Sequence, residues 1–309
     1  MKRHVILSII LVVLWNVSCK KSGSNPVEVK SSPKWVHLDS ALINGDVYAM
    51  AGSGSTLFAG VDLGAYRSMD SGKSWSAFES GLYPRTVYSL LVRDTLVFAG
   101  TGYALFTSTI NGVSWTAIDS GKSFNCFAVS GTKIFAGTSA GVLRSTDNGS
   151  TWTPINSGLT DLSVDHLASC NENLFASING YIFQSTNGGS SWNQATLGSA
   201  STLFSAVASS GTNIFVGATD GIYLSTNSGA NWSRIVIEPP PFGVLAFAIF
   251  DTRIFAATRD RVPCYVKTDS TWTLSDVELE YTATQAFLAI GNTLLAGGTD
   301  GLWMRSLTN

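Results

Sequence analysis

Short apolar segments recur along this chain of 309 residues at a nearly constant interval. They read LFAG, VFAG, IFAG, LFAS, IFVG, IFAA and LLAG, and their second residues are Phe58, Phe98, Phe135, Phe175, Phe215, Phe255 and Leu295. Successive segments are 40 residues apart, except for one interval of 37. Each segment is too short for a helix, is rich in β-branched and aromatic residues, and is flanked by turn residues. The pattern therefore predicts β-strands.

The third repeat shows the order of strands within one unit. Phe124–Ser130 is largely apolar and is predicted to be the innermost strand, packed on both faces. Residues 133–137 and 142–145 predict the second and third strands, and residues 151–155 predict the fourth. Four short strands per unit, joined by Gly-rich turns, are typical of a propeller blade.

Seven tryptophans keep the same spacing, at positions 35, 75, 115, 152, 192, 232 and 272. Self-similarity at this period in a β-rich chain indicates one propeller blade per repeat. The last repeat stops at Asn309, before its fourth strand. Trp35 lies in a segment that matches a fourth strand, but the first three strands of a blade do not precede it. We therefore expect an all-β, seven-bladed β-propeller of four-stranded antiparallel blades. The N-terminal strand would complete the last blade and close the ring, which leaves no open sheet edge.

A turn motif accompanies most of these tryptophans, with the pattern Ser/Thr-x-Asp-x-Gly-x-x-Trp and its clearest copy at residues 145–152. The Asp can accept hydrogen bonds from its own turn, the Gly can adopt positive φ and the Trp can bury its ring. Because the motif recurs, we expect a structural role for Asp70, Gly72, Trp75, Asp147, Gly149, Trp152, Asn187, Gly189, Trp192, Asn227, Gly229 and Trp232. Ile110 stands at the Asp position in the second repeat, so that blade must form its turn differently.

This motif resembles the Asp-box, or BNR repeat, of sialidases, sortilin-like propellers and the photosystem II stability/assembly factor family, over about residues 34–309. The resemblance implies that Asp-boxes lie at the outer turn between the third and fourth strands, and that ligands meet the opposite face. Sialidases also use a triad of converging arginines. Arg67, Arg144 and Arg305 recur at the ends of third strands, so they should be spread around the ring.

The loops predicted on the ligand face differ most in the last third of the chain. Residues 238–242 replace a short Ser-Gly-Leu connector with a run containing three prolines, which stiffen it. Mixed charge on neighbouring blades then marks a candidate recognition patch, with solvated, mutually paired loop residues as the alternative. Its predicted members are Arg259, Asp260, Arg261, Glu278, Glu280 and Tyr281.

The first residues differ from the rest. Met1–His4 is basic and residues 5–17 form an apolar run of 13, too short to span a bilayer comfortably. We interpret residues 1–19 as an export signal ending in a lipoprotein-type cysteine, Cys19, with plain signal cleavage or an uncleaved anchor as alternatives. Residues 20–33 are expected to be a flexible tether and residues 34–309 the propeller. The expected location is the bacterial cell envelope, either periplasmic or surface-exposed, with the lipid anchor as the only membrane contact.

Composition narrows the chemistry. Only 13% of residues are charged and the net charge is −2, so the chain has no basic field for nucleic acid. Beyond Cys19 the cysteines are Cys126, Cys170 and Cys264, which form no CxxC pair, and the three histidines are scattered. We therefore expect neither a metal nor a cofactor. We also expect the protein to be a monomer.

Three functions follow as hypotheses, one of which is a structural cell-surface protein with no defined ligand. The first is a non-catalytic scaffold whose loop face binds a protein or glycan partner, as the likeness to the assembly-factor repeats implies. The alternative is a glycosidase-like hydrolase of sialidase type that uses acids such as Glu278 and Glu280. A catalytic residue is not expected elsewhere, since no nucleophile can be paired with Asp165 and His166 from the sequence.

Overall fold

The computed structural model describes most of the chain. The described residues are 35–38, 45–84, 86–197, 204–235, 243–250, 253–258, 264–268, 271–275, 284–299 and 301–307. Contacts divide the chain into residues 1–31 and 32–309, and every described residue belongs to the second unit. Within the described ranges, no helix is long and apolar enough to cross a membrane.

The described strands fall into four classes by their place in a sheet. The innermost strands have seven residues each: β2 (Val47–Ser53), β6 (Val87–Arg93), β10 (Phe124–Ser130), β14 (Val164–Cys170), β18 (Phe204–Ser210), β22 (Val244–Phe250) and β26 (Thr284–Ile290). The second strands contain the repeated apolar segments: β3 (Thr56–Val61), β7 (Leu96–Thr101), β11 (Lys133–Thr138), β15 (Asn173–Ile178), β19 (Asn213–Ala218), β23 (Arg253–Thr258) and β27 (Thr293–Gly298).

The third strands are β4 (Gly64–Ser68), β8 (Ala104–Thr109), β12 (Gly141–Ser145), β16 (Tyr181–Ser185), β20 (Gly221–Ser225), β24 (Cys264–Thr268) and β28 (Gly301–Ser306). The outermost are β5 (Ser76–Ala77), β9 (Thr116–Ser120), β13 (Thr153–Pro154), β17 (Asn193–Gln194), β21 (Ser233–Ile235), β25 (Thr271–Ser275) and β1 (Val36–His37). The fourth strand expected over residues 151–155 is thus shorter, because Thr151 and Trp152 still belong to the preceding turn.

These strands pair into seven four-stranded antiparallel sheets. Six sheets use four consecutive strands each, from β2–β5 to β22–β25, and we number them blades 1 to 6 in chain order. The remaining sheet, blade 7, has the order β26-β27-β28-β1, with Val36 opposite Met304. The N-terminal strand therefore completes the last blade, as the sequence predicted.

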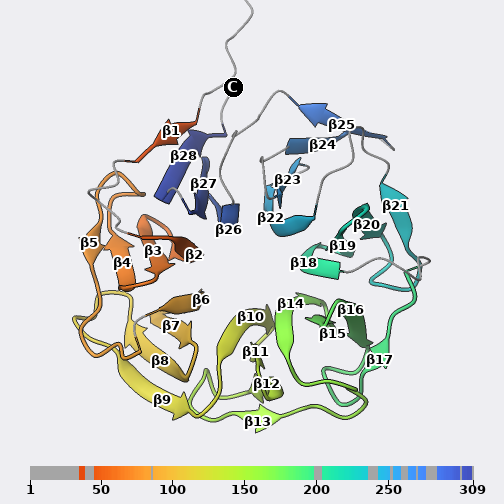
Figure 1. The fold of residues 1–309 in the computed structure, drawn as a ribbon, viewed down its shortest axis with the longest axis horizontal. Helices are drawn as coiled ribbons and strands as arrows, with labels where there is room; N and C mark the ends of the chain where they lie inside the picture. Colours follow the sequence, from red (N-terminus) through yellow and green to blue (C-terminus); the bar gives the residue numbers. More distant parts are fainter. Residues whose placement is uncertain are drawn as a thin grey trace, which may run out of the picture. The chain divides into compact units, whose positions relative to one another are not determined.

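The blades are arranged side by side around a common axis (Figure 1). Each innermost strand contacts the innermost strand of the next blade, from β2 and β6 through to β22 and β26. Strand β26 in turn contacts β2, so the series returns to its beginning. All-β structure, four-stranded antiparallel blades and closure through the N-terminal strand follow the expectation from the repeats.

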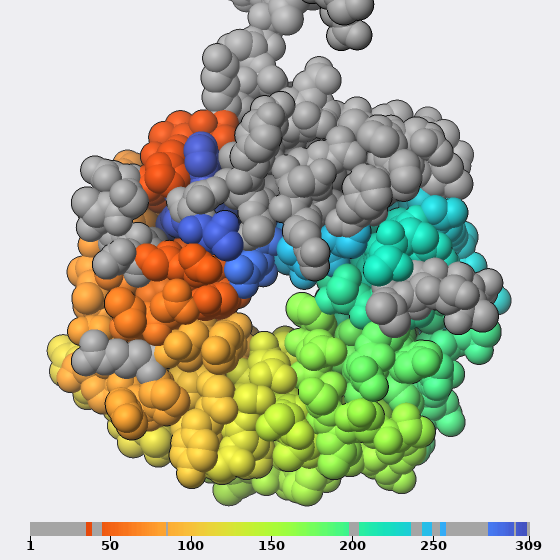
Figure 2. Space-filling view, viewed as in Figure 1, coloured from red at the N-terminus to blue at the C-terminus, as the bar shows by residue number. Residues whose placement is uncertain are grey.

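The prediction that the innermost strand packs on both faces is wrong. Only two of the seven residues of β10 are buried, whereas five of the six residues of β11 are buried. The reason is that the innermost strands surround an opening at the centre of the ring, which Figure 2 shows. The second strand, which lies between two others of its own sheet and between the neighbouring blades, carries the core instead.

A glycine marks the closest approach between most neighbouring blades. A Cβ built on Gly60 would lie 2.6 Å from Cγ1 of Val87, the first residue of the next innermost strand. The same contact closes the ring, because a Cβ on Gly297 of blade 7 would lie 2.4 Å from Cγ1 of Val47 in blade 1. In blade 4, Ser177 occupies this position, and its hydroxyl donates to the first carbonyl of β18 at 3.1 Å.

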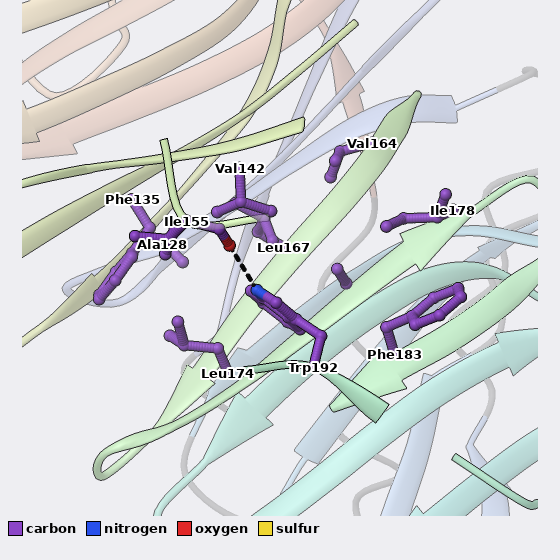
Figure 3. Close-up of a cluster of buried hydrophobic side chains, with 11 residues drawn as sticks. Ala128, Phe135, Val142, Ile155, Val164, Leu167, Leu174, Ile178, Phe183 and Trp192 are labelled. Carbon is purple, nitrogen blue, oxygen red and sulfur yellow. Dashed lines mark hydrogen bonds between the residues drawn. The ribbon is translucent and has the colours of Figure 1, made fainter. Parts of the chain in front are cut away.

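A tryptophan also joins blades 3 and 4 (Figure 3). The Trp192 indole Nε1–H donates to the Ile155 carbonyl at 2.7 Å, and its backbone N–H donates to the Ser157 carbonyl at 2.8 Å. The ring is only 2% exposed and packs among apolar side chains of both blades. Trp192 thus lies in blade 4 in the sequence but contacts both blade 3 and blade 4.

The repeated tryptophans do not all behave in this way. Trp115 joins blade 2 to blade 1 through the carbonyls of Phe78 and Ser80, at 2.7 and 2.8 Å. Trp75 and Trp152 instead donate their indole N–H to the glycine carbonyl of their own turn, each at 3.1 Å. The difference follows the preceding connector, which reads Ser-Gly-Leu before Trp115 and Trp192 but Ser-Gly-Lys before Trp152.

The glycine of that connector supports a prediction. Gly158 has φ 91° and a Cβ there would lie 2.2 Å from the Trp192 carbonyl oxygen, whereas Gly121 has φ 86° and a Cβ there would meet nothing within 4 Å. Both Gly→Ala changes incur the positive-φ cost of about 1–2 kcal/mol. We expect Gly158→Ala to lower the free energy of unfolding by roughly a further 1–3 kcal/mol through overpacking.

Urea denaturation of the wild type, Gly158→Ala and Gly121→Ala would measure this difference. Equal losses for the two variants would show that the contact with Trp192 contributes nothing beyond backbone strain.

Candidate functional site

The antiparallel order of the strands divides the connections between two faces of the ring. The connectors between blades and the turns from second to third strands lie together on one face, which we call the loop face. Backbone hydrogen bonds join the two kinds of loop there, such as Gly141 N–H to the Leu162 carbonyl and Gly121 N–H to the Tyr103 carbonyl. The Asp-box turns, between third and fourth strands, lie on the other face.

The recognition patch predicted from the sequence lies outside the described residues. This applies to Arg259, Asp260, Arg261, Glu278, Glu280 and Tyr281, and equally to residues 238–242 and Cys19. Those assignments remain predictions.

The Asp-box of blade 3 forms a closed hydrogen-bonded turn. Asp147 Oδ1 accepts the Thr151 N–H at 2.9 Å and Oδ2 accepts the Thr151 hydroxyl at 2.6 Å. The buried Ser145 hydroxyl donates to Asp147 Oδ1 and accepts the Gly149 N–H, each at 2.8 Å. Gly149 has φ 87°, as the motif requires. Every polar atom that defines the motif therefore bonds within the turn.

The same turn recurs in the other boxes. Asp70 repeats the carboxylate contacts in blade 1, accepting the Ser74 N–H at 2.9 Å. Asn187 and Asn227 provide the same acceptor in blades 4 and 5, to Ser191 and Asn231, at 2.9 Å each. An amide therefore replaces the carboxylate without loss of this bond.

Blade 2 forms its turn in another way, as expected from Ile110. The Ser108 hydroxyl donates to the Ser114 carbonyl at 2.7 Å, and the Gly112 N–H donates to the Thr109 carbonyl at 2.9 Å. The backbone and one hydroxyl thus substitute for the missing carboxylate.

Arginines at the ends of third strands reach the Asp-box turn of the next blade. The Arg67 guanidinium donates to the Gly112 carbonyl at 2.8 Å, and Arg144 donates to the Gly188 carbonyl at 3.5 Å. Gln184 plays the same part in blade 4 by donating to the Ser228 carbonyl at 3.2 Å. Arg67 and Arg144 therefore tie separate pairs of blades together and do not converge on a shared ligand.

Sequence reasoning missed a feature at the loop-face ends of the innermost strands. Each strand shifts register by one residue at its second position, for example from Val87 opposite Thr101 to Ser89 opposite Gly100. Such β-bulges re-aim side chains and are common near functional sites. The residues at the seven shifts are Tyr48, Tyr88, Asn125, Asp165, Ser205, Leu245 and Gln285. Aligning the repeats on their apolar segments would have shown that this position is occupied by a different kind of residue in most blades.

Some of these bulge residues connect blades. Asn125 Nδ2 donates to the Val164 carbonyl at 2.8 Å, and the Ser205 hydroxyl donates to the Val244 carbonyl at 2.5 Å. Each carbonyl belongs to the first residue of the next innermost strand. Both side chains are therefore already engaged in hydrogen bonds between blades.

Burial governs the titration of Asp165 and His166, which are consecutive residues of β14. Burial, followed by the nearby Asp161 carboxylate, raises the pKa of Asp165, while burial lowers the pKa of His166 to about 4. The imidazole is thus neutral at pH 7. Burial also raises the pKa of the neighbouring Cys126 thiol above its ordinary value, so this thiol is a poor nucleophile. In the described ranges, no group of three or more metal-ligating side chains comes together.

Exposed aromatic side chains gather on the loop face. The described tyrosines that are exposed are Tyr83, Tyr88, Tyr103 and Tyr181, at 85%, 43%, 57% and 51%. Tyr83 lies in a connector, Tyr88 at a bulge, and Tyr103 and Tyr181 in or directly after a turn between second and third strands. All four positions belong to the loop face, whereas none lies in an Asp-box turn.

This architecture defines the chain as a β-propeller. A family model described as the DUF6242 beta propeller domain matches residues 125–244, which is less than half of the chain. A comparison with curated proteins finds no match.

Solved propellers share the fold at low sequence identity. YCF48 from Cyanidioschyzon merolae is 15% identical with a TM-score of 0.70, and the match covers 89% of this chain and 98% of that one. A structure of YCF48 bound to D1 peptide is 16% identical with a TM-score of 0.72, covering 90% and 97%. A GH74 xyloglucanase from Xanthomonas campestris is 16% identical with a TM-score of 0.69, covering 89% of this chain but 54% of the enzyme.

The Asp-box carboxylates predict a pH dependence. Hydrogen bonds from Ser74 and Ser68 lower the pKa of Asp70 to about 2, and bonds from Thr151 and Ser145 do the same for Asp147. A pKa lowered by folding stabilises the fold above the unfolded-state value, near 4, and this contribution is lost as the pH falls through 2. We expect Asp70→Asn/Asp147→Asn to show a smaller drop in melting temperature between pH 5 and pH 2 than the wild type.

Calorimetry on both proteins would measure the two drops. Parallel curves across this range would contradict the assignment. An Asp147→Ala variant serves as the control, because it removes the acceptor itself and should lower the melting temperature at neutral pH as well.

Proposed function

We propose that this chain is a non-catalytic β-propeller that binds a protein partner through its loop face. The observation that carries the proposal is the placement of the exposed tyrosines, all four of which lie on that face in the described part of the chain. Tyrosine is enriched in binding surfaces because it combines a large apolar ring with a polar hydroxyl. The opposite face is occupied by turns whose polar atoms bond to one another.

Two further observations favour binding over catalysis. The Asn125 and Ser205 side chains at the bulges are bonded to neighbouring blades, and burial lowers the pKa of His166, so its imidazole is neutral at pH 7. The YCF48 structure with a bound D1 peptide is an example of a propeller of this fold that binds a protein segment.

A glycosidase-like hydrolase is the alternative function. The acids that the sequence nominated for it, Glu278 and Glu280, lie outside the described residues. The fold is shared with a GH74 xyloglucanase, but the present chain spans about half of that enzyme. A glycan bound without hydrolysis is the third outcome that an experiment must separate.

Photo-crosslinking can test which face binds. Leu162 on the loop face and Val113 in the turn of blade 2 on the opposite face are exposed apolar residues, at 42% and 84%. We expect p-benzoylphenylalanine at position 162 to form crosslinks to a protein in the producing cells, and the same residue at position 113 to form none, although it is the more exposed of the two.

Crosslinks from position 113 alone would reject the loop face as the binding surface. Release of reducing sugar from xyloglucan or a sialoside by the purified chain would instead support the hydrolase.

We also propose that the chain is exported and anchored in the cell envelope by a lipid on Cys19. The proposal rests on the basic start, the apolar run of residues 5–17 and the cysteine that follows. We expect Cys19→Ala to move the protein from the membrane fraction to the soluble fraction. A Cys19→Ala protein that stays in the membrane would indicate an uncleaved anchor instead.

A further inference from the structure

Aromatic side chains and carboxylates lie together on the loop face of blades 1 and 2, which are neighbours in the ring (Figure 1). We call this group the tyrosine patch and define it by Tyr48, Asp62, Leu63, Tyr88 and Tyr103. Tyr103 and Leu63 are each 57% exposed and Tyr88 is 43% exposed, so the patch presents apolar area to solvent. Large exposed apolar side chains next to one another commonly mark a binding surface.

The two bulges hold the first pair of rings in place. Tyr48 and Tyr88 are the extra residues in β2 and β6, and their ring centroids lie 5.5 Å apart with an interplanar angle of 59°. The Tyr48 hydroxyl donates to Asp62 Oδ1 at 2.8 Å. The Tyr88 ring therefore packs against the Tyr48 ring, whose position is fixed by the hydrogen bond of its hydroxyl.

The turn from β7 to β8 places Tyr103 beside this pair. A Cβ on Gly102 would lie 3.4 Å from Tyr88 Cε2, so the Tyr88 ring lies against this turn. The Thr101 hydroxyl accepts the Tyr103 N–H at 3.3 Å, and the Tyr103 carbonyl accepts the Gly121 N–H at 2.9 Å. The backbone that carries Tyr103 is therefore fixed on both sides.

Two carboxylates among the described residues bring negative charge to the rings. Asp62 and Asp46 both act on Tyr48: the hydrogen bond to Asp62, burial and the two carboxylate charges raise its pKa to about 12. The Lys122 backbone N–H donates to the Tyr103 carbonyl at 3.3 Å, and the Lys122 ammonium pairs with Asp119 at 2.8 Å. The Tyr48 hydroxyl already donates its hydrogen bond to Asp62. The Asp62–Tyr48 pair therefore presents acceptor lone pairs, and no donor, to a ligand.

We propose that the tyrosine patch binds an arginine- or lysine-bearing segment of a protein partner, with the cation against the tyrosine rings and within reach of Asp62. Aromatic faces attract cations, and a guanidinium also stacks on a ring while donating to a carboxylate. A sugar would use the same rings, but it gains nothing from the charges of Asp46 and Asp62. This inference rests on the proposed function and adds the chemistry of the partner.

Fluorescence anisotropy of labelled peptides with the full-length protein in detergent can test the inference. The probe is Gly-Gly-Arg-Gly-Arg-Gly-Gly, and its control carries citrulline, a neutral isostere, at both arginine positions. We expect the arginine peptide to bind at least about fivefold more tightly than the citrulline peptide, and raising the salt to reduce this preference.

Three variants locate the binding. Asp62→Asn keeps an acceptor for Tyr48 and removes the charge, while Tyr103→Ala removes an exposed ring, and each should raise the Kd of the arginine peptide about fivefold. Tyr181→Ala is the matched control, because that tyrosine is similarly exposed, at 51%, but lies on blade 4. Tyr181→Ala should leave the Kd unchanged, and melting temperatures establish that each variant is folded.

Equal binding of both peptides, or an equal loss for Tyr181→Ala, would overturn the proposal. Binding of chitohexaose that Tyr103→Ala abolishes would assign the patch to glycans instead. If position 162 crosslinks to a partner but the patch variants bind the arginine peptide like the wild type, only this inference fails. If position 162 forms no crosslinks either, the proposed function fails with it.

Discussion

The structure depends on how closely one blade can approach the next. The second strand of a blade meets the first residue of the neighbouring innermost strand, and the side chain there leaves no room for a Cβ in most blades. Gly60 and Gly297 both show this contact, the second across the point where the ring closes. Interiors at native packing density do not absorb an added methyl group at such a distance without displacement. The approach therefore fixes the spacing between blades, and the tryptophans and arginines add hydrogen bonds to a geometry that is already set.

Much of the fold could be predicted because this contact repeats. A glycine or small residue at a fixed place in each apolar segment, and a tryptophan at a fixed distance after it, give strands, blades and closure through Trp35 from the sequence alone. Two predictions were wrong because each depends on structure outside the segment from which it was made. An apolar segment such as Phe124–Ser130 does not reveal whether its second face meets another sheet or a central opening, and the length of a fourth strand depends on where the turn before it ends.

Partners across blades were harder to predict than the motifs themselves. Trp152 and Trp192 stand in nearly the same local sequence, yet one indole bonds to its own turn and the other to the preceding blade. The connector of the preceding blade differs, and that information lies some 30 residues upstream of the tryptophan. The candidate site was missed for a related reason: Tyr48 and Tyr88 become neighbours only because both blades carry a bulge at the same position. The repeat period of a sequence does not show which side chains of neighbouring blades come into contact.

Closure through β1 also has a consequence for the timing of folding. Val36 pairs with Met304, so β1 acquires its partner only after β28 has been synthesised. Contacts of such large sequence separation form late, since the chain between them must already be ordered before the loop-closure cost falls. Blades 1 to 6 each find their four strands locally, but the ring stays open until β28 has been synthesised. During this interval the exposed edge of β28 and the unpaired β1 could pair with another chain, and the speed of closure therefore sets how long the nascent protein is vulnerable to misassembly.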